Sequence, residues 1–310
     1  MIYTVTFNPA IDYVVHTGRM QFGMVNRSEK EEIYYGGKGI NVSYVLKQLG
    51  TESVALGFVA GFTGDAIERG VREMGIRTDF VHLPAGNSRI NIKIKSEEET
   101  ELNCQGPDIG EESVEELFHK LESIQDGDTL ILAGSIPASM PDDIYEKILD
   151  RLKDKEIKII VDATGKLLMH VLKYRPFLIK PNHHELGAMF GKELTEDEEI
   201  IFHARKLKEL GAKNVLVSMA EKGAILLDEY GKIHKCGACS GEVKNSVGAG
   251  DSMVAGFVAG SLSGDYLSAL QLGCVCGSAT AFSEGLAGKE EIRTLWEIVT
   301  GMPHRGDFAN

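Results

Sequence analysis

The glycine-rich stretch Asn245–Gly256 carries the clearest chemical signal in the chain. Gly248-Ala249-Gly250 opens a small-residue segment that predicts a helix running towards Leu262. A glycine turn at a helix start lets several backbone N–H groups point at one anion, and the helix dipole adds to the attraction. This stretch therefore predicts an anion-binding turn.

Asp251 directly follows that turn. A carboxylate in the first turn of a helix can be no more than a favourable partner of the helix dipole. Next to a bound phosphate, however, its negative charge is unfavourable unless the carboxylate takes part in the reaction. A base that accepts the proton of an attacking hydroxyl takes part in this way. We therefore favour Asp251 as the general base of a phosphoryl transfer.

A second glycine-rich site is Gly36-Gly37-Lys38-Gly39-Ile40-Asn41, directly before an amphipathic segment. It matches neither the Walker A pattern nor the dinucleotide pattern G-x-G-x-x-G. Taken alone, the glycines fit a plain loop-to-helix turn equally well. Lys38 and Asn41 lie one helical turn apart, however, so together they can hold one polar ligand.

The third site is the segment Lys180–Glu185, which follows a predicted strand. Asn182 can cap a helix whose first turn contains Glu185, and this capping is a sufficient structural reason for both residues. Asn and Glu oxygens at the carboxyl end of a parallel strand also suit Mg²⁺ with its water shell. Both interpretations remain open at this point.

Short β-branched runs alternate with amphipathic helical segments along most of the chain. Near-continuously apolar strands that alternate with helices indicate a mainly parallel sheet covered on both faces. The predicted strands are Ile2–Phe7, Ser53–Val59, Thr129–Ala133, Lys158–Asp162, Phe177–Lys180, Asn214–Ser218 and Ala224–Leu227. The predicted helices between them include Gly39–Leu49, Asp65–Met74, Ser113–Ile124, Pro141–Lys153 and Glu198–Leu210.

Two segments, Ile11–Tyr35 and Arg89–Gln105, break this alternation and read as extended chain. Polar and apolar residues alternate in them, most clearly in Arg89–Lys95, which is typical of a sheet with one face in water. We expect one domain over residues 1–310, with a small β-sheet lid formed by about residues 11–35 and 88–106.

Composition limits the possible partners and location. The chain has 310 residues and a net charge of −13, which argues against nucleic acid, because binding its phosphates needs a basic surface. The N-terminus lacks the pattern of a signal peptide. Tyr266–Ala287 carries a single charge and many small residues, which favours a buried helix over a membrane span. Five scattered cysteines suit a reducing cytoplasm and are interpreted as structural thiols.

Taken together, these sites resemble those of the ribokinase-like carbohydrate kinases of the minor phosphofructokinase type. Gly36–Asn41 is similar to the first signature of that family, Val247–Asp251 to its second, and Asn182-x-x-Glu185 to its N-x-x-E motif. The similarity spans essentially the whole chain in the expected order. The resemblance implies a three-layer α/β sandwich with a β-sheet lid.

Further details make the chain most similar to the bacterial 1-phosphofructokinase branch. Many family members have Asp-Thr where this chain has Asn245-Ser246, and Ser88 stands where Thr is expected before the arginine. The segments that carry the closer resemblance are Asn8–Asp12, Ser88–Lys93, Gln105–Pro107 and Gly134–Pro137.

The resemblance also implies roles for individual residues. For the sugar phosphate, it implies that Asp12 binds the hydroxyls and that Lys38 and Arg89 bind the phosphate. Gly37, Asn41 and Ser135 would lie beside them. Lys180, Ser218 and Gly223 would contact ATP, and Asn182 and Glu185 would hold Mg²⁺ through water. Gly248, Ala249 and Gly250 would form the anion hole, with Asp251 as the base. Independently of the resemblance, the planar guanidinium of Arg89 is well suited to phosphate.

The expected reaction is transfer of phosphate from ATP to D-fructose 1-phosphate, giving D-fructose 1,6-bisphosphate. The nearest alternative changes the sugar to tagatose 6-phosphate. A different class of alternative is a non-catalytic sugar-phosphate sensor on the same fold, although a sensor has no need of the base Asp251.

We also expect a homodimer formed through the lid. The two lid segments provide too few strands to bury both faces of a sheet, and a small isolated sheet is marginal in water. Their apolar residues Tyr13, Val15, Ile90, Ile92 and Ile94 therefore need a partner surface. The alternative is a lid that folds down fully on its own domain and leaves a monomer.

Overall fold

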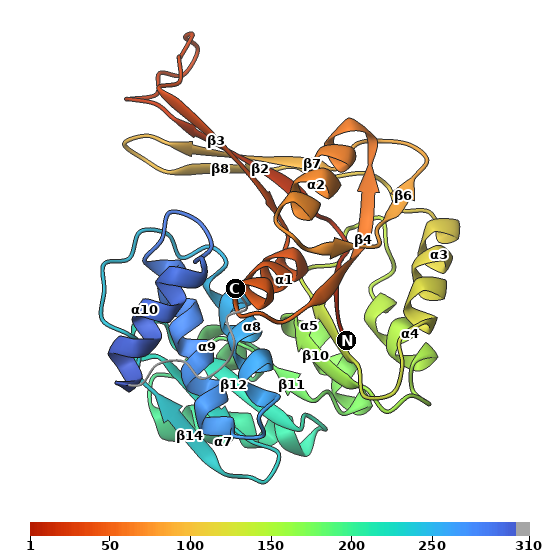
Figure 1. Ribbon diagram of the computed structural model, residues 1–310, viewed down its shortest axis with the longest axis vertical. Coiled ribbons are helices and arrows are strands. Elements are labelled where there is room, and N and C mark those ends of the chain that lie inside the picture. The colour runs from red at the N-terminus through yellow and green to blue at the C-terminus, as the bar shows by residue number, and fades with distance from the viewer. Residues whose placement is uncertain (302–310) are drawn as a thin grey trace.

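A ten-stranded sheet forms the centre of the computed structural model, which describes residues 1–301 (Figure 1). Its strands lie in the order β14-β13-β12-β11-β10-β9-β1-β4-β5, and β6 pairs with β4. The strands pair in parallel except at β13, which is antiparallel to both of its neighbours, β12 and β14. The strands are β1 Ile2–Thr6, β4 Ser53–Ala60, β5 Arg77–Thr78, β6 Val81–Leu83, β9 Thr129–Ala133, β10 Lys158–Asp162, β11 Leu178–Ile179, β12 Asn214–Ser218, β13 Ala224–Leu227 and β14 Ile233–Cys236.

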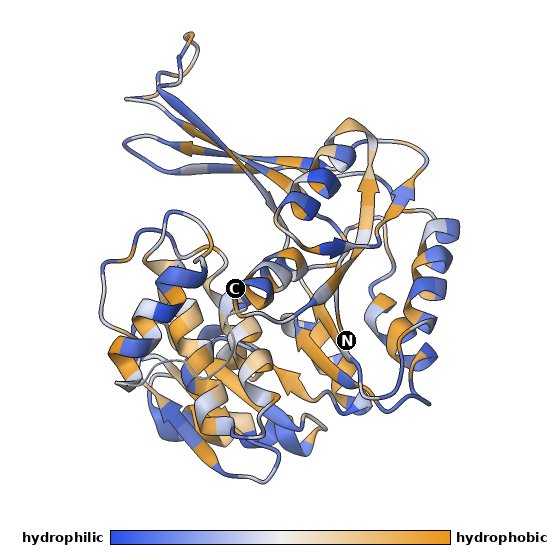
Figure 2. Ribbon diagram, viewed as in Figure 1, coloured by the Kyte–Doolittle hydropathy of each residue, from blue (hydrophilic) through white to orange (hydrophobic). Residues whose placement is uncertain are grey.

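Helices cover both faces of this sheet, as predicted. Helices α3 to α7 pack on one face, and α1, α2 and α8 to α10 pack on the other. Figure 2 shows the consequence, because apolar residues concentrate on the central strands and polar residues on the outer helix surfaces. The helices are α1 Lys38–Gln48, α2 Gly61–Glu73, α3 Glu111–Glu122, α4 Ile144–Arg151, α5 Gly165–Val171, α6 His183–Met189, α7 Asp197–Glu209, α8 Ala249–Ser261, α9 Tyr266–Ala281 and α10 Lys289–Thr300.

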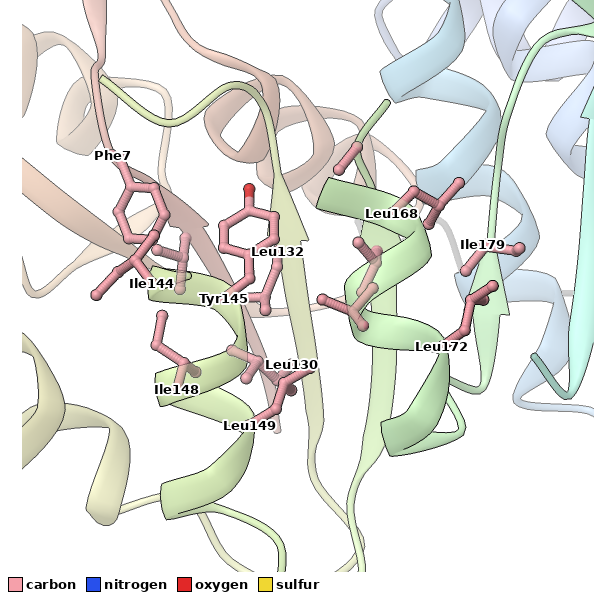
Figure 3. Close-up of a cluster of buried hydrophobic side chains, with 14 of the residues drawn as sticks. Phe7, Leu130, Leu132, Ile144, Tyr145, Ile148, Leu149, Leu168, Leu172 and Ile179 are labelled. Carbon is pink, nitrogen blue, oxygen red and sulfur yellow. The ribbon is translucent and has the colours of Figure 1, made fainter. Parts of the chain in front are cut away.

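The cluster in Figure 3 shows how one face is held together. Ile144, Tyr145 and Ile148 of α4 are fully buried and face strand β9 and Phe7. Tyr145 keeps its one polar atom satisfied, because its hydroxyl donates to the carbonyl oxygen of Gly134 at 2.9 Å. That carbonyl belongs to the loop after β9, so the core fixes a segment at the carboxyl edge of the sheet.

Helices α8 and α9 approach each other so closely that their backbones touch. A Cβ at Gly256 would lie 2.6 Å from the carbonyl oxygen of Leu272, and one at Gly273 would lie 2.9 Å from that of Met253. Any larger side chain at either glycine would push the helices apart. The predicted buried helix thus corresponds to α9, and no helix within residues 1–301 is long and apolar enough to cross a membrane.

The two segments predicted as extended pair with each other in a separate four-stranded sheet, ordered β3-β2-β7-β8 (Figure 1). Strand β2 is antiparallel to β3 and parallel to β7, and β7 is antiparallel to β8. The strands are β2 Ala10–His16, β3 Lys30–Gly36, β7 Arg89–Lys95 and β8 Thr100–Asn103.

The two faces of this small sheet differ. In register, Asp12 lies between Tyr34 and Asn91, so these three residues share one face, and this face looks onto a cavity above α1. On the opposite face, Ile11, Tyr35 and Ile90 pack against α2. Further along that face lie Tyr13, Val15, Ile33, Ile92, Ile94 and Leu102, which are partly or largely exposed.

Candidate active site

Asp251 lies in the first turn of α8 and is buried, with 5% of its surface exposed. Gly248 caps the helix with a φ of +81°, a left-handed conformation that glycine adopts without strain. The side-chain amide of Asn41, in the first turn of α1, donates to Asp251 Oδ2 at 2.8 Å. The first and second glycine-rich sites, 210 residues apart, therefore meet at this carboxylate.

A second buried carboxylate, Asp162, lies at the end of β10 and holds two lysines. Its Oδ2 is 3.2 Å from Lys38 Nζ, and its Oδ1 is 3.4 Å from Lys180 Nζ. Lys180 Nζ also lies beside Gly250, 3.2 Å from the place where a Cβ would stand. Two ammonium groups are thus held close to the glycine turn that carries Asp251.

The charges in this cluster act on both carboxyl groups. Burial, followed by the charge of Asp162, raises the pKa of Asp251 to about 6, against the opposing effect of Lys38, the Asn41 hydrogen bond and Lys180. For Asp162, burial also acts to raise the pKa, but Lys180 and Lys38 outweigh it and hold the pKa below its usual range. Asp162 therefore remains an anion, whereas Asp251 can exchange a proton near neutral pH.

Asn182 and Glu185 form the predicted capping box at the start of α6. Asn182 Oδ1 accepts from the Glu185 backbone N–H at 2.8 Å, and Glu185 Oε2 accepts from the Asn182 backbone N–H at 2.8 Å. Asn182 also pairs with Ser218, so this cap adjoins the end of β12.

The capping box bears on whether these residues fit Mg²⁺. The capping bonds engage one oxygen of each side chain and leave the second carboxylate oxygen of Glu185 for another ligand. Within residues 1–301, no three His, Cys, Asp or Glu side chains gather as a complete metal site. The donor set therefore fits a hydrated Mg²⁺ held through water and not one enclosed by protein ligands.

Ser218 and Gly223 bracket a short turn after β12. Gly223 has a φ of +86°, and a Cβ there would lie 2.1 Å from the carbonyl oxygen of Cys236. The Met219 backbone N–H donates to the Gly223 carbonyl at 2.8 Å and closes the turn. Ser218 therefore lies next to Asn182, and this turn lies on the same edge of the sheet as Lys180, the third residue expected to contact the nucleotide.

A cavity of about 340 Å³ lies between the four-stranded sheet and α1, and Asn41 is the residue of this cluster that lines it. Asp12, Gly36, Asn41 and Lys93 are among the residues that line it. Lys93 Nζ is 3.7 Å from Asp12 Oδ2, so the cavity wall contributed by the sheet carries both charges. Asn41 belongs to both regions, since it lines the cavity and donates to Asp251.

Three other expected sugar-phosphate residues lie around this region. Arg89 is the first residue of β7, is partly buried, and donates from Nε to the Asn8 carbonyl at 3.1 Å. Gly37 precedes α1 with a φ of +136°. Ser135 is exposed in the loop after β9, next to Gly134, which approaches Lys38.

Asp162 is the residue that sequence reasoning missed. It is the last residue of a correctly predicted strand, and a carboxylate at the carboxyl end of a parallel strand was the available signal. The signal was weak because both of its lysine partners come from other elements, one of them 124 residues away.

The model of the pfkB family of carbohydrate kinases matches residues 4–293. The chain is 47% identical to 1-phosphofructokinase of Bacillus subtilis, covering 95% of this chain and 97% of that protein. It is 41% identical to D-tagatose-1-phosphate kinase of Bacillus licheniformis, over 92% of this chain and 94% of that one.

Two solved structures are similar over nearly the whole chain. The first is a candidate phosphofructokinase of Staphylococcus aureus, with a TM-score of 0.86, 42% identity, and 96% and 97% coverage of the two chains. The second is phosphofructokinase-2 of Escherichia coli, with a TM-score of 0.90, 24% identity, and 96% and 99% coverage. This second likeness supports the fold alone.

Proposed function

The chain belongs to the pfkB family of carbohydrate kinases, and from that premise we propose that it phosphorylates D-fructose 1-phosphate to D-fructose 1,6-bisphosphate with ATP. The observation that carries the proposal is the buried Asp251 at the start of α8, close to two lysines held by Asp162 and hydrogen-bonded to Asn41, which lines the cavity. The 47% identity to a protein named 1-phosphofructokinase supports the choice of sugar.

In the proposed reaction, the C6 hydroxyl of the sugar attacks the γ-phosphorus of ATP in line with the bond that breaks. Asp251 accepts the hydroxyl proton, and ADP leaves with the electrons of the broken P–O bond. Backbone N–H groups of Gly248, Ala249 and Gly250 face the charge that develops on the transferred phosphate. Because the pKa of Asp251 lies near 6, its carboxylate is available as a base at neutral pH.

Lys38 and Lys180 neutralise the transferred phosphate in this proposal. The sequence suggested that Lys38 binds the phosphate of the substrate together with Arg89, but its contact with Asp162 favours a place beside Asp251. Arg89, in the sheet above the cavity, keeps the role of binding the sugar phosphate. Asn182 and Glu185 would hold a hydrated Mg²⁺, which supplies further positive charge to the ATP phosphates.

A second candidate substrate is D-tagatose 1-phosphate, since a relative 41% identical to the chain carries that name. Both sugars have their phosphate on C1, whereas the alternative expected from the sequence, tagatose 6-phosphate, does not. A coupled ADP-release assay with fructose 1-phosphate, tagatose 1-phosphate, tagatose 6-phosphate and fructose 6-phosphate tests the ranking. We expect fructose 1-phosphate to give the highest kcat/KM.

The same assay separates a kinase from a non-catalytic sensor. ADP release that stays at background with all four sugars, while calorimetry still detects sugar binding, would refute the kinase proposal. The Asp251→Asn variant is the matched control, because it should bind the sugar and release ADP only slowly.

We also propose that two copies pair through the exposed face of the four-stranded sheet. On this face Ile33 is 53% exposed and Leu102 is 60% exposed, next to Ile92 and Ile94 in the same sheet. A contiguous apolar face of this kind is stabilised by a second copy.

Light scattering at micromolar concentration tests the dimer. We expect twice the subunit mass for the unmodified protein and one subunit mass for the double variant Ile92→Glu/Ile94→Glu. The matched control is Ile298→Glu, at an isoleucine of α10 that is 73% exposed and lies outside the sheet. A single subunit mass for the unmodified protein would refute the dimer, and a double variant that remains dimeric would place the interface elsewhere.

A further inference from the structure

Asn91 is a buried amide in the middle of the four-stranded sheet, with 7% of its surface exposed. Its Nδ2 donates to Asp12 Oδ1 at 2.8 Å. Its Oδ1 is buried and finds no hydrogen-bond partner within residues 1–301. Buried polar atoms are nearly always paired, and leaving one unpaired costs free energy, so this acceptor calls for a partner from outside the chain.

The direction of the amide follows from its neighbour. An ionised carboxylate only accepts hydrogen bonds, so Asp12 requires a donor from Asn91. Turning the amide over would place Oδ1 against a carboxylate oxygen, which is repulsive. The nitrogen of Asn91 is therefore committed to Asp12, and the oxygen is the free atom.

The sheet register places the Asn91 side chain on the face of the sheet that borders the cavity. Asn91 lies directly beside Asp12 in the parallel β2–β7 pair, and neighbours in register share a face of the sheet. Asp12 and Lys93, two residues further along β7 on the same face, both line the cavity. Asn91 is not itself among the lining residues, and it lies buried between two side chains that are.

A purely structural role explains the side-chain nitrogen of Asn91 but not its buried oxygen. To orient Asp12, one donor is enough, and the backbone of β7 is already paired with strands on both sides. In the same row, Asn103 of β8 is exposed, so water can satisfy its amide. The side-chain amide of Asn91, by contrast, is buried, and its oxygen accepts no hydrogen bond from the described residues.

We propose that Asn91 is a specificity-determining residue whose Oδ1 accepts a hydrogen bond from a hydroxyl of the phosphosugar, while its Nδ2 holds Asp12 ready to accept from the neighbouring hydroxyl. This inference rests on the proposed function and deepens it. Asp12 and Asn91 together present acceptors to the sugar, so the site recognises two adjacent hydroxyl donors. Such a site rejects sugars that lack one of these hydroxyls, because an acceptor is then left unpaired.

The test crosses protein variants with deoxy sugars. Steady-state kinetics are measured for the unmodified protein, Asn91→Ala and the matched control Asn103→Ala, using fructose 1-phosphate and its 3-deoxy and 4-deoxy analogues. We expect Asn91→Ala to raise the KM for fructose 1-phosphate by about 10-fold to 100-fold, the usual effect of losing one buried hydrogen bond. The KM for ATP should stay the same, and Asn103→Ala should behave as the unmodified protein does.

The deoxy sugars identify the hydroxyl. For one of the two analogues, the unmodified protein and Asn91→Ala should differ in KM by less than about 3-fold, because the hydroxyl that contacts Oδ1 is already missing. An equal increase in KM for all three sugars would overturn the inference, since Asn91 would then act only through Asp12 or the fold. An unchanged KM for fructose 1-phosphate would overturn it as well.

Two further measurements keep the outcome decisive. Calorimetric binding of fructose 1-phosphate without ATP should weaken by the same factor as the KM rises. Should Asn91→Ala unfold, Asn91→Val removes the same donor and acceptor with a side chain suited to a strand, and the same substrate pattern is expected from it. If the unmodified protein neither binds nor phosphorylates the sugar, the proposed function fails; if it does both, only the pattern of the variants decides the role of Asn91.

Discussion

Replacing Asp162 with Asn removes one negative charge from the buried cluster beside Asp251 and hardly changes the shape of the side chain. Lys38 Nζ and Lys180 Nζ lose a counter-ion at 3.2 and 3.4 Å. With an effective dielectric constant of 20, each contact corresponds to about 5 kcal/mol of Coulomb energy before the cost of burying the charge is subtracted. The two lysines then act on Asp251 without a competing anion.

The sign of the effect on Asp251 follows directly. Its pKa is raised from the model-peptide value of 3.8 to about 6, first by burial and second by the charge of Asp162. Removing that charge lowers the pKa, and the freed lysines lower it further. Because Asp251 stays buried, we expect its pKa to fall by only about 1 unit. This corresponds to about 1.4 kcal/mol in favour of the ionised form of Asp251.

The assay is the pH profile of kcat/KM for fructose 1-phosphate between pH 4.5 and 8. Its acid limb reports the protonation of the base in the free enzyme, so the limb of Asp162→Asn should lie about 1 pH unit lower than that of the unmodified protein. Titration of the substrate phosphates is common to both proteins and cancels in the comparison.

Asp228→Asn is the matched control for this experiment. Asp228 is also buried, at 2% exposure, and its Oδ2 lies 2.8 Å from His234 Nε2. It follows β13, which is antiparallel to β12, and therefore lies at the opposite edge of the sheet from Asp251. This variant should leave the acid limb in place. An acid limb of Asp162→Asn that stays in place or moves to higher pH would refute the electrostatic coupling.

Three further predictions concern the proposed roles. Asp251→Asn should keep the fold and ATP binding but lose turnover by about 10²-fold to 10⁴-fold; retention of more than half the turnover would make Asp251 a helix-terminus residue only. Arg89→Ala should raise the KM for the sugar phosphate much more than that for ATP, and the reverse pattern in steady-state kinetics would place Arg89 in the other subsite. Activity should require Mg²⁺ or Mn²⁺, and Glu185→Gln should need a higher metal concentration in a titration, whereas full activity in excess EDTA would contradict any metal role.

The central sheet was predictable because its strands are buried on both faces. Every residue of β4 and β9 is buried, and such runs are visible in the sequence as unbroken apolar segments. The short strands β5 and β6 at one edge and β14 at the other were not predicted, because they are only two to four residues long and partly exposed. Helix α2 begins four residues earlier than predicted, at Gly61.

The candidate site was predictable only where its contacts are local. The capping box of Asn182 and Glu185 spans three residues, so the pattern alone identifies it. The contact of Asn41 with Asp251 spans 210 residues and exists only because the topology brings α1 and α8 together. The burial of Asn91 Oδ1 without a hydrogen-bond partner in the described residues likewise depends on which residues pair across the strands. The alternation of polar and apolar residues in the sequence does not specify this pairing.

The direct contact between α8 and α9 has a consequence for redesign. Gly256 and Gly273 leave no room for a side chain, so α8 has no freedom to shift against its neighbour without unpacking both helices. The end of α8 that carries Asp251 is thus a fixed reference point in the molecule. Libraries intended to change the sugar specificity should therefore vary the cavity-facing positions of β2 and β7. They should keep the α8–α9 glycines constant, because these glycines fix the position of Asp251.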